Sequence, residues 1–504
     1  MRRLFLCLIL LVLSSSVAEA QVRSTALVSP ESARQLGLER MWFAQLHLDR
    51  SRGRMGGLHM HVSSSEALTV FQITDGGKRH VYSQRDRDAF GKEIGIEGAK
   101  QRAEEKQGEI KKALELAGKP NAEPPPVETH VVPKIMFYAT SERGLLHALD
   151  GETGRTIWTT SVGNPRYPTT AAAANDKFVG VCNGSTLYVL LATDGSLVWT
   201  RPAVSSPGAG PALSTDLIFV PMVTGQIESF LLEDPSRPVK VYQSFGRAMV
   251  QPVVSANSVA WPTDKGNLYV GMANDSGVRF RMEAKEAITS APAFLAPDRI
   301  FVTSLDGYLY CVSESRGNMV WRFTTGEPIS HSPITLGDRV YVITDRGNMF
   351  AIDTNTAVDQ WVTPNIRTYI SGNDQRLYCL DVRGDLVILD RASGSPLGTI
   401  AAGLLDVPIL NTQTDRIILA SATGLVQCFR ESSRPWPTVH YLLEAPKRDA
   451  KPAKTDAPKT DDKTEPMPKP ENDPFGNSAD PFGAPAPAKP AAPAAPPADP
   501  FGNP

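Results

Sequence analysis

The sequence predicts an all-β fold, an eight-bladed β-propeller, preceded by a small α+β module and followed by a tail that forms no core. Three observations support it: a glycine recurs about every 40 residues, short β-like runs lie on both sides of it, and an aromatic residue usually follows at a fixed distance. The chain has 504 residues, of which 41% are hydrophobic, enough for a large buried core. A helical repeat is excluded because the units lack a 3.6-residue apolar period.

The repeat has eight units, and successive glycines lie 37 to 41 residues apart. β-Branched and aromatic runs such as residues 300–302 and 340–343 precede the glycine, and a second apolar run follows it, which is the pattern of a hairpin. Four short strands per unit are typical of propeller blades around a central channel. The glycines that mark the units are Gly144, Gly184, Gly225, Gly266, Gly307, Gly347, Gly384 and Gly424.

A large aromatic residue stands 14 or 15 positions after most of these glycines. At this position a repeated tryptophan is expected to bury itself against the neighbouring blade, rather than to bind a ligand. Phe280 replaces the tryptophan in one unit, and Val241 and Leu397 are weak substitutes in two others. The tryptophans are Trp158, Trp199, Trp321 and Trp361.

Residues 144–158 read Gly-Leu-Leu-His-Ala-Leu-Asp-Gly-Glu-Thr-Gly-Arg-Thr-Ile-Trp. This segment resembles the repeat of pyrroloquinoline-quinone-type propellers, in which a glycine-led strand reaches Asp-x-x-Thr-Gly and then tryptophan. The resemblance extends over residues 129–443. Within that family, the architecture is most similar to the noncatalytic periplasmic propellers of the BamB type, and the resemblance implies that each repeat tryptophan docks between two blades.

Quinone-dependent dehydrogenases share this repeat and are the alternative function. The resemblance implies that such an enzyme carries a quinone, a calcium ion, a catalytic aspartate and an adjacent pair of cysteines, and this sequence has no two neighbouring cysteines. Asp150, Asp353 and Asp390 occupy equivalent turns of their units, where an Asx-type turn explains them. We therefore assign no catalytic residue, no cofactor and no metal.

The first 20 residues have the pattern of a secretory signal peptide. Arg2 and Arg3 precede a short apolar run, and Ala18-Glu19-Ala20 offers a small-x-small cleavage site. The apolar run has about ten residues, too few to span a bilayer. We therefore expect an exported protein, periplasmic or extracellular, with no transmembrane segment in the mature chain.

Residues 21–126 are predicted to form a small α+β module, in which four strands (42–48, 58–62, 68–74 and 79–83) precede a helix over residues 97–117. A proline run at 124–126 then leads into the propeller, residues 127–443. A ninth, diverged blade is the alternative for the four strands.

Histidines in this module raise the question of a metal site. His59 and His61 share one face of a predicted strand, with His47 on the strand before. Zinc needs three or four ligands, and no cysteine or carboxylate completes the set. The apolar neighbours Leu58, Met60 and Val62 make the histidines the solvated side of an amphipathic strand.

Four cysteines remain after the signal peptide, and each stands in an apolar β-like run. Free, buried thiols are expected there, although export permits disulfides. These residues are Cys182, Cys311, Cys379 and Cys428.

The tail, residues 444–504, is rich in proline, alanine, lysine and aspartate, and its composition predicts disorder. Asp-Pro-Phe-Gly occurs in it three times, with phenylalanines Phe475, Phe482 and Phe501. The copies are either a spaced peptide motif or compositional drift, since composition alone does not decide between them.

The sequence thus predicts a secreted, noncatalytic scaffold that binds a protein partner in the cell envelope. The charge is nearly balanced, with 52 Lys and Arg against 54 Asp and Glu, so nucleic acid is not an expected partner. A propeller that binds a small ligand or glycan in its channel is a second alternative.

Overall fold

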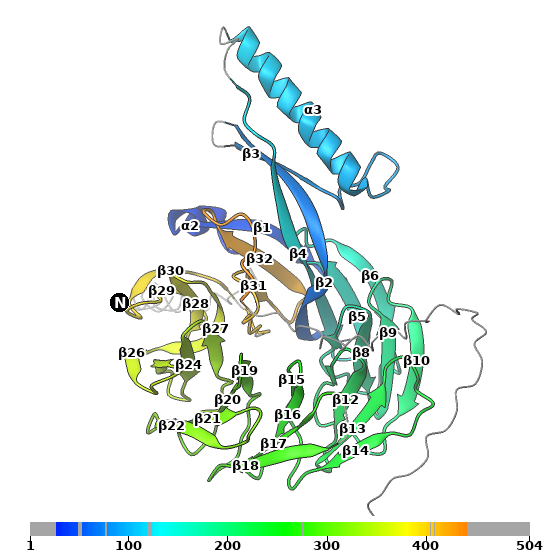
Figure 1. Cartoon of the computed structure of the whole chain (residues 1–504), viewed down its shortest axis with the longest axis vertical. Coiled ribbons are helices and arrows are strands. Elements are labelled where there is room, and N and C mark those ends of the chain that lie inside the picture. The colour runs from blue at the N-terminus through cyan, green and yellow to red at the C-terminus, as the bar shows by residue number, and fades with distance from the viewer. Residues whose placement is uncertain are drawn as a thin grey trace, which may run out of the picture. The chain divides into compact units, whose positions relative to one another are not determined.

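The computed structural model describes residues 27–48, 53–75, 78–117, 123–274, 277–403, 405–407 and 409–440. Within these residues the strands form eight antiparallel sheets, six with four strands, one with five and one with three. Figure 1 shows the sheets arranged as blades around a common axis, with one strand of each blade near the axis and another at the periphery. The predicted eight-bladed propeller is confirmed.

Several predicted features lie outside the described residues. They are the signal peptide at 1–20, the tail at 444–504 and its three phenylalanines, Phe475, Phe482 and Phe501.

Six blades share one plan, in which four consecutive strands run in order from the axis to the periphery. Blades 2, 3 and 4 consist of β7 (Ala173–Ala174), β8 (Phe178–Asn183), β9 (Thr186–Leu191) and β10 (Leu197–Pro202); β11 (Ala212–Leu213), β12 (Leu217–Pro221), β13 (Gln226–Leu231) and β14 (Lys240–Gln243); and β15 (Val253–Val254), β16 (Ser258–Pro262), β17 (Asn267–Met272) and β18 (Val278–Glu283).

Blades 5, 6 and 7 repeat this plan. They consist of β19 (Ala293–Leu295), β20 (Arg299–Thr303), β21 (Tyr308–Ser313) and β22 (Met319–Thr324); β23 (Ile334–Leu336), β24 (Arg339–Ile343), β25 (Met349–Asp353) and β26 (Asp359–Thr363); and β27 (Ile366–Gly372), β28 (Arg376–Asp381), β29 (Leu386–Asp390) and β30 (Pro396–Ile400).

The burial pattern explains why these segments form strands in these places. The second strand of a blade is covered on both faces, so it is continuously apolar, and all five residues of β12 are buried. The outer strand has one face in solvent, and in β22 exposed and partly buried residues largely alternate. The four cysteines named above are free and buried in the second or third strands of four different blades.

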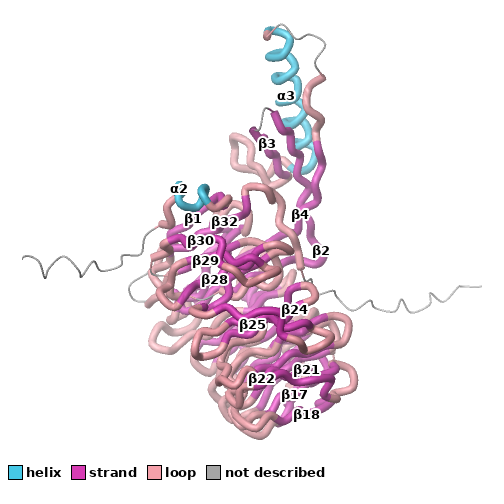
Figure 2. Tube along the Cα trace, turned by 90° about the vertical axis from the view of Figure 1, so that its left-hand side faces the viewer, coloured by secondary structure: helices cyan, strands magenta, loops and turns pink. Residues whose placement is uncertain are grey.

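Blade 1 contains five strands in the order β3–β2–β4–β5–β6. The strands β2 (Met55–Asp75) and β4 (Glu128–Ser141) are long, and Figure 2 shows that they continue out of the propeller as a hairpin. On this extension, β3 pairs with β2, and α3 packs against Phe71 and Ile73 through Ala99, Ala103 and Ile110. The remaining elements of this blade and its extension are β3 (Lys78–Ser83), β5 (Leu145–Asp150), β6 (Thr156–Ser161) and α3 (Gly95–Leu116).

The predicted helix is present as α3, and the predicted strands 58–62 and 68–74 are two parts of the single strand β2. A register shift between Val62 and Ala67 separates the parts. The polar residues within the shift have partners, because Ser63 Oγ accepts hydrogen bonds from the amides of Ser65 and Glu66. No helix of the described chain is long and apolar enough to cross a membrane.

Blade 8 is assembled from both ends of the described chain. Its strands β31 (Ile417–Ala420) and β32 (Leu425–Glu431) come from the C-terminal side, and β1 (Leu38–Gln45) pairs with β32 along the outer edge. The short helix α2 (Pro30–Gln35) precedes β1.

The structure therefore differs from the predicted separate module at 21–126, since β1 lies in blade 8 and the first part of β2 in blade 1. A ring of blades has to join its last blade to its first, and a strand from the opposite end of the chain makes that joint.

The eight repeat glycines all lie in the turn between the second and third strands of their blades, and all have positive φ. Gly225 shows why this turn requires glycine. Its φ is +86°, and a Cβ there would lie 2.0 Å from the carbonyl oxygen of Gly246 in the loop toward the next blade.

The four repeat tryptophans occupy the outer strands and reach across to the next blade. In each case the indole Nε1 donates a hydrogen bond to a backbone oxygen there. The acceptors are Ala192 for Trp158 (3.0 Å), Leu232 for Trp199 (2.8 Å), Thr354 for Trp321 (3.0 Å) and Arg391 for Trp361 (3.1 Å).

In blades 3 and 7 the residue at the tryptophan position is not the one expected from the sequence. The register aligns Lys240 and Gly398, rather than Val241 and Leu397, with the tryptophans of the other blades. Val241 and Leu397 are both exposed. At Gly398 the space is filled by Leu36, since a Cβ on this glycine would lie 2.6 Å from Leu36 Cδ2. The segment before β1 thus supplies the apolar group that blade 7 lacks.

Trp42, on β1, is the tryptophan of blade 8. It pairs with Cys428, and its Nε1 donates a hydrogen bond of 2.9 Å to the carbonyl oxygen of Gly151 in blade 1. Its ring packs against Gly154, where a Cβ would lie 2.3 Å from Trp42 Cε3. The repeat contact therefore continues across the joint between the last blade and the first.

A buried ion pair lies at the same joint. The Arg416 side chain, 1% exposed, approaches Glu152 of blade 1 (Nε to Oε1, 3.7 Å) and donates to the carbonyl oxygen of Pro435 (2.9 Å). Burial raises the pKa of Glu152, and the nearby Arg416 opposes that rise. Because removing two charges from water offsets much of their attraction, the pair adds little net stability to the contact between the blades.

Trp42→Ala is expected to weaken the closed ring. The substitution removes a buried aromatic side chain and leaves a cavity, so the free energy of unfolding should fall by about 3–5 kcal/mol. Denaturant unfolding of the full chain measures the change. Phe43→Ala, on the exposed side of the same strand, is the matched control, and an equal loss in both variants would contradict the role given to Trp42.

Candidate interaction surface

The antiparallel plan of the blades puts two kinds of connection at one end of the propeller. The glycine turns lie there, and so do the loops that join the outer strand of each blade to the inner strand of the next. Backbone hydrogen bonds connect them, for example from Val162 N to Gly144 O (2.7 Å) and from Gly184 N to Pro168 O (2.9 Å). We call this end the loop face.

An arc of exposed apolar side chains lies on the loop face. Val204 is 82% exposed and Phe245 65% exposed, and Tyr167 and Met249 are exposed as well. These four residues come from three successive blade-to-blade loops, β6–β7, β10–β11 and β14–β15. Exposed apolar side chains that recur on successive loops of one face are candidates for a surface that binds another molecule.

The loops that carry the arc are held in place by side-chain contacts. The Phe245 amide donates to the Tyr269 hydroxyl (2.9 Å). Arg247 bonds to Asp264 through both its amide and its Nε, each at 2.7 Å. Because these contacts fix the loop, binding there loses little conformational entropy.

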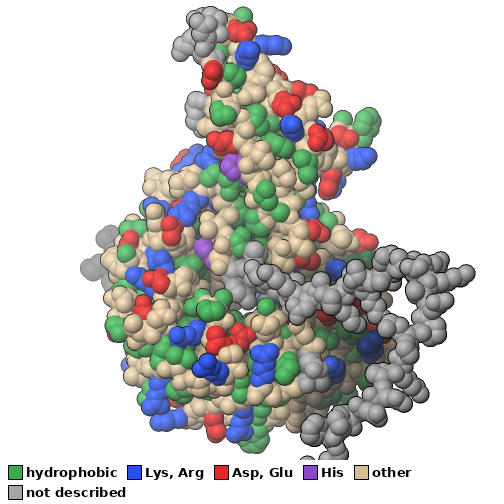
Figure 3. All heavy atoms as spheres, viewed as in Figure 1, with side chains coloured by type: hydrophobic (Ala, Val, Ile, Leu, Met, Phe, Trp, Pro, Cys, Tyr) green, Lys and Arg blue, Asp and Glu red, His purple; other side chains and the backbone are tan. Residues whose placement is uncertain are grey.

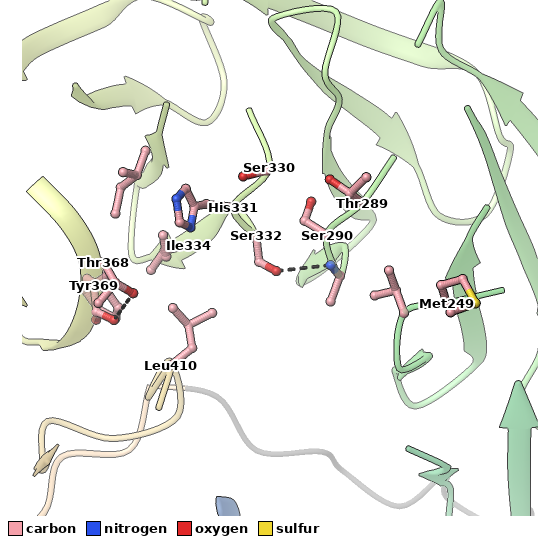
Figure 4. A pocket seen from close by; sticks show the side chains of 13 residues that line it. Met249, Thr289, Ser290, Ser330, His331, Ser332, Ile334, Thr368, Tyr369 and Leu410 are labelled. Carbon is pink, nitrogen blue, oxygen red and sulfur yellow. Dashed lines mark hydrogen bonds between the residues drawn. The ribbon is translucent and has the colours of Figure 1, made fainter. Parts of the chain in front are cut away.

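A cavity of about 420 Å³ opens where the loop face meets the axis, as Figure 4 shows. It is lined by side chains of blades 4 to 8, with Met249 and Leu410 as its exposed apolar members and His331 as its one histidine. Its lining contains no aspartate or glutamate. A calcium-bound quinone, which needs carboxylate ligands, has no ligand set in this lining.

Three hydroxyl groups of the cavity take part in hydrogen bonds within blades 5 and 6 or between these two blades. Ser332 Oγ accepts a hydrogen bond from the Ala291 amide (3.1 Å), and Ser330 Oγ donates to Asp345 (2.6 Å). Ser290 Oγ lies 2.8 Å from Thr303 Oγ1. These three hydroxyl groups are thus already engaged by neighbouring groups of the propeller.

The histidines of the β2 region are not arranged as a metal site. His61 Nε2 lies 2.8 Å from Asp176 Oδ1 in the blade 2 loop between β7 and β8. Burial, and then the charge of His61, lower the pKa of His59 to about 4, so His59 is neutral at pH 7. Among the described residues no three His, Cys, Asp or Glu side chains are grouped as metal ligands.

The aspartates Asp150, Asp353 and Asp390 form the turns that their positions predict. Oδ1 of Asp353 accepts from the amides of Asn355 (2.9 Å) and Thr356 (2.8 Å), and these bonds lower the pKa of the carboxyl group. Asp150 and Asp390 accept equivalent bonds from Thr153 and Ser393. Their carboxylates are thus engaged by the backbone of their own turns.

No sequence motif marks the arc on the loop face. A weak signal is present, however. Within segments rich in Gly, Pro and Ser, an exposed apolar residue stands 20 to 24 positions after a repeat glycine, and these residues are Tyr167, Val204, Phe245 and Met249. An apolar residue in a turn-rich segment that recurs with the repeat is therefore informative. Figure 3 shows acidic and basic side chains intermixed on the face that it views, without a block of one sign.

The model of one protein family, described as outer membrane protein assembly factor BamB, matches residues 111–236 and 264–403, more than half of the chain. A protein named outer membrane protein assembly factor BamB from Shewanella oneidensis is 22% identical over 278 residues, which cover 50% of this chain and 68% of that protein.

Two solved structures are similar in fold. BamB from Moraxella catarrhalis has a TM-score of 0.50 and 18% identity, over 58% of this chain and 91% of that chain. A computationally designed protein, Ika8, has a TM-score of 0.49 and 14% identity, over 58% and 93% of the two chains.

Glu228 provides a pH test of the packing beneath the arc. It is buried, its Oε1 accepts from the Val204 amide (3.3 Å), and burial raises the pKa of its carboxyl group. A raised pKa in the folded state means that stability is lost as pH rises above the pKa of the unfolded chain, about 4.3.

Glu228→Gln keeps the acceptor oxygen and removes the charge. The variant should therefore gain stability over the parent protein as pH rises from 4 to 7. Thermal unfolding at several pH values measures this gain, and a difference that stays constant across the range would contradict the assignment.

Proposed function

Because the chain belongs to the family of the outer membrane protein assembly factor BamB, we propose that it is a noncatalytic propeller scaffold that holds a protein partner in the cell envelope. The observation that carries this proposal is the arc of Tyr167, Val204, Phe245 and Met249 on fixed loops of the loop face. Aromatic and methionine side chains are enriched where proteins bind one another.

Two further points support the proposal. The relative from Shewanella oneidensis is named as an assembly factor for outer membrane proteins, which fits a propeller that presents a binding face. The first 20 residues have the pattern of a secretory signal, which fits export to the envelope.

The noncatalytic part of the proposal rests on the cavity at the axis. Three of its hydroxyl groups are engaged in contacts within or between blades, and no carboxylate is among its lining residues. This lining supports the proposal that the loop face serves in contact rather than in reaction.

Phe245→Asp is expected to weaken capture of the partner from the native envelope fraction by at least about tenfold, because a charge replaces a central apolar contact. Val241→Asp is the matched control, since Val241 is similarly exposed but lies on the outer strand of the same blade. Quantitative mass spectrometry of the captured proteins measures the effect. Equal capture by Phe245→Asp and the parent protein would contradict a binding site on this arc.

A chain that ends at Leu443 tests whether the propeller suffices. The arc is complete without the tail, so the shortened chain should keep the partner that depends on Phe245. Loss of that same partner on truncation would contradict the assignment of binding to the loop face.

A further inference from the structure

The loop between β3 and α3 contains a tight turn that displays one phenylalanine. Phe90 is 95% exposed, the most exposed of the large hydrophobic side chains in the described chain. It lies outside the part of the chain that matches the family model, residues 111–236 and 264–403.

Hydrogen bonds that involve Asp88, mostly as the acceptor, close this turn. Asp88 Oδ1 accepts from the amides of Phe90 and Lys92, both at 2.9 Å. The Asp88 carbonyl oxygen accepts from Gly91 N (3.1 Å), and Asp88 N donates to Lys92 O (2.9 Å). The turn is thus closed by its own main chain and by the aspartate side chain.

The turn is also fixed to the rest of the extension. Arg87 and Glu93 form a β-bridge across its base, and Arg102 of α3 donates to the Arg87 carbonyl oxygen (3.2 Å). Phe90 is therefore held outward on a rigid base rather than left on a mobile loop.

The residues of this turn read Asp-Ala-Phe-Gly, and the tail contains Asp-Pro-Phe-Gly three times. Four of the chain's 18 phenylalanines therefore stand in an Asp-x-Phe-Gly motif. This recurrence, together with the folded copy, favours a shared motif over compositional drift.

The geometry of the folded copy accounts for each position of the motif. Aspartate closes the turn, and glycine is required because Gly91 has φ of +82°. The Ala89 amide donates no hydrogen bond within the described part of the chain, so a proline is tolerated at this second position. Neither the Ala89 methyl group nor the Phe90 ring takes part in these hydrogen bonds, and the Phe90 ring is 95% exposed.

We propose that Asp-x-Phe-Gly is a four-copy recognition motif, and that Phe90 is its preformed copy. The ligand is a protein of the cell envelope with an apolar pocket that accepts one phenylalanine ring, present in several copies on the partner or its oligomer. Several weak sites in one chain then give a high combined affinity. This inference rests on the proposed scaffold function and places a second binding element outside the loop face.

Photo-cross-linking in the full chain tests the motif. Benzoylphenylalanine replaces Phe90, and the envelope fraction is irradiated with and without an excess of a synthetic peptide of residues 470–485, which contains two copies. A cross-linked protein is expected, and the peptide should reduce its yield at least about tenfold by occupying the same pocket. The same peptide with Phe475→Ala and Phe482→Ala should leave the yield unchanged.

Benzoylphenylalanine at Leu116, exposed at the other end of α3, is the matched control and should not give the peptide-sensitive product. No cross-link at position 90, or one that the peptide does not reduce, would overturn the proposal. A cross-link only to lipid would overturn it in favour of membrane contact.

Asp88→Ala keeps Phe90 but removes the side chain that closes the turn, so the peptide-sensitive cross-link should weaken. An undiminished cross-link would contradict the preformed turn. Failure of these tests leaves capture through Phe245 intact, and the two proposals are thereby distinguished.

Discussion

Closure of the ring is the constraint on which the rest of the structure depends. Each blade packs against its two neighbours, so the ring closes only if the last blade packs against the first. The chain solves this with β1, which completes blade 8 and carries Trp42 onto Gly151 and Gly154 of blade 1. The same indole-to-backbone contact holds blades elsewhere in the ring together, and the joint is thus made with the chemistry of the repeat.

The joint also determines where the chain can carry extra elements. The β2–β4 hairpin extends from blade 1, beside the joint. The segment after β32 contacts it where the rings of Trp436 and His130 lie 4.9 Å apart, with their planes tilted by 32°. The hairpin leaves at the end of the blades opposite the glycine turns, because it connects the first and second strands of blade 1. The hairpin thus does not cover the loop face, and the turn of Phe90 lies on the extension.

Much of the fold was predictable because each repeat unit needs the same turn and the same contact with the next blade, so the same residues recur at a fixed spacing. Eight glycines at one spacing predict eight turns, and tryptophans at a fixed distance predict the contact between blades. Trp42 carried no such signal, because its partner Cys428 is distant in the sequence and only the closed ring brings the two together. The arc of Phe245 and Val204 was missed for another reason, since binding surfaces require neither periodicity nor a motif. The turn of Phe90 was missed because its sequence, Asp-Ala-Phe-Gly, differs at one position from the Asp-Pro-Phe-Gly copies of the tail. Only the hydrogen bonds of the turn show that this position tolerates either residue.

The central claim is that a closed, noncatalytic ring binds its partner through the loop face. Hydrogen–deuterium exchange of the full chain, alone and with the partner captured through it, tests this most directly. Binding through the loop face should slow exchange in the loops β6–β7, β10–β11 and β14–β15 and leave the outer strands unchanged. Protection confined to the outer strands, with those loops exchanging as in the free protein, would contradict it.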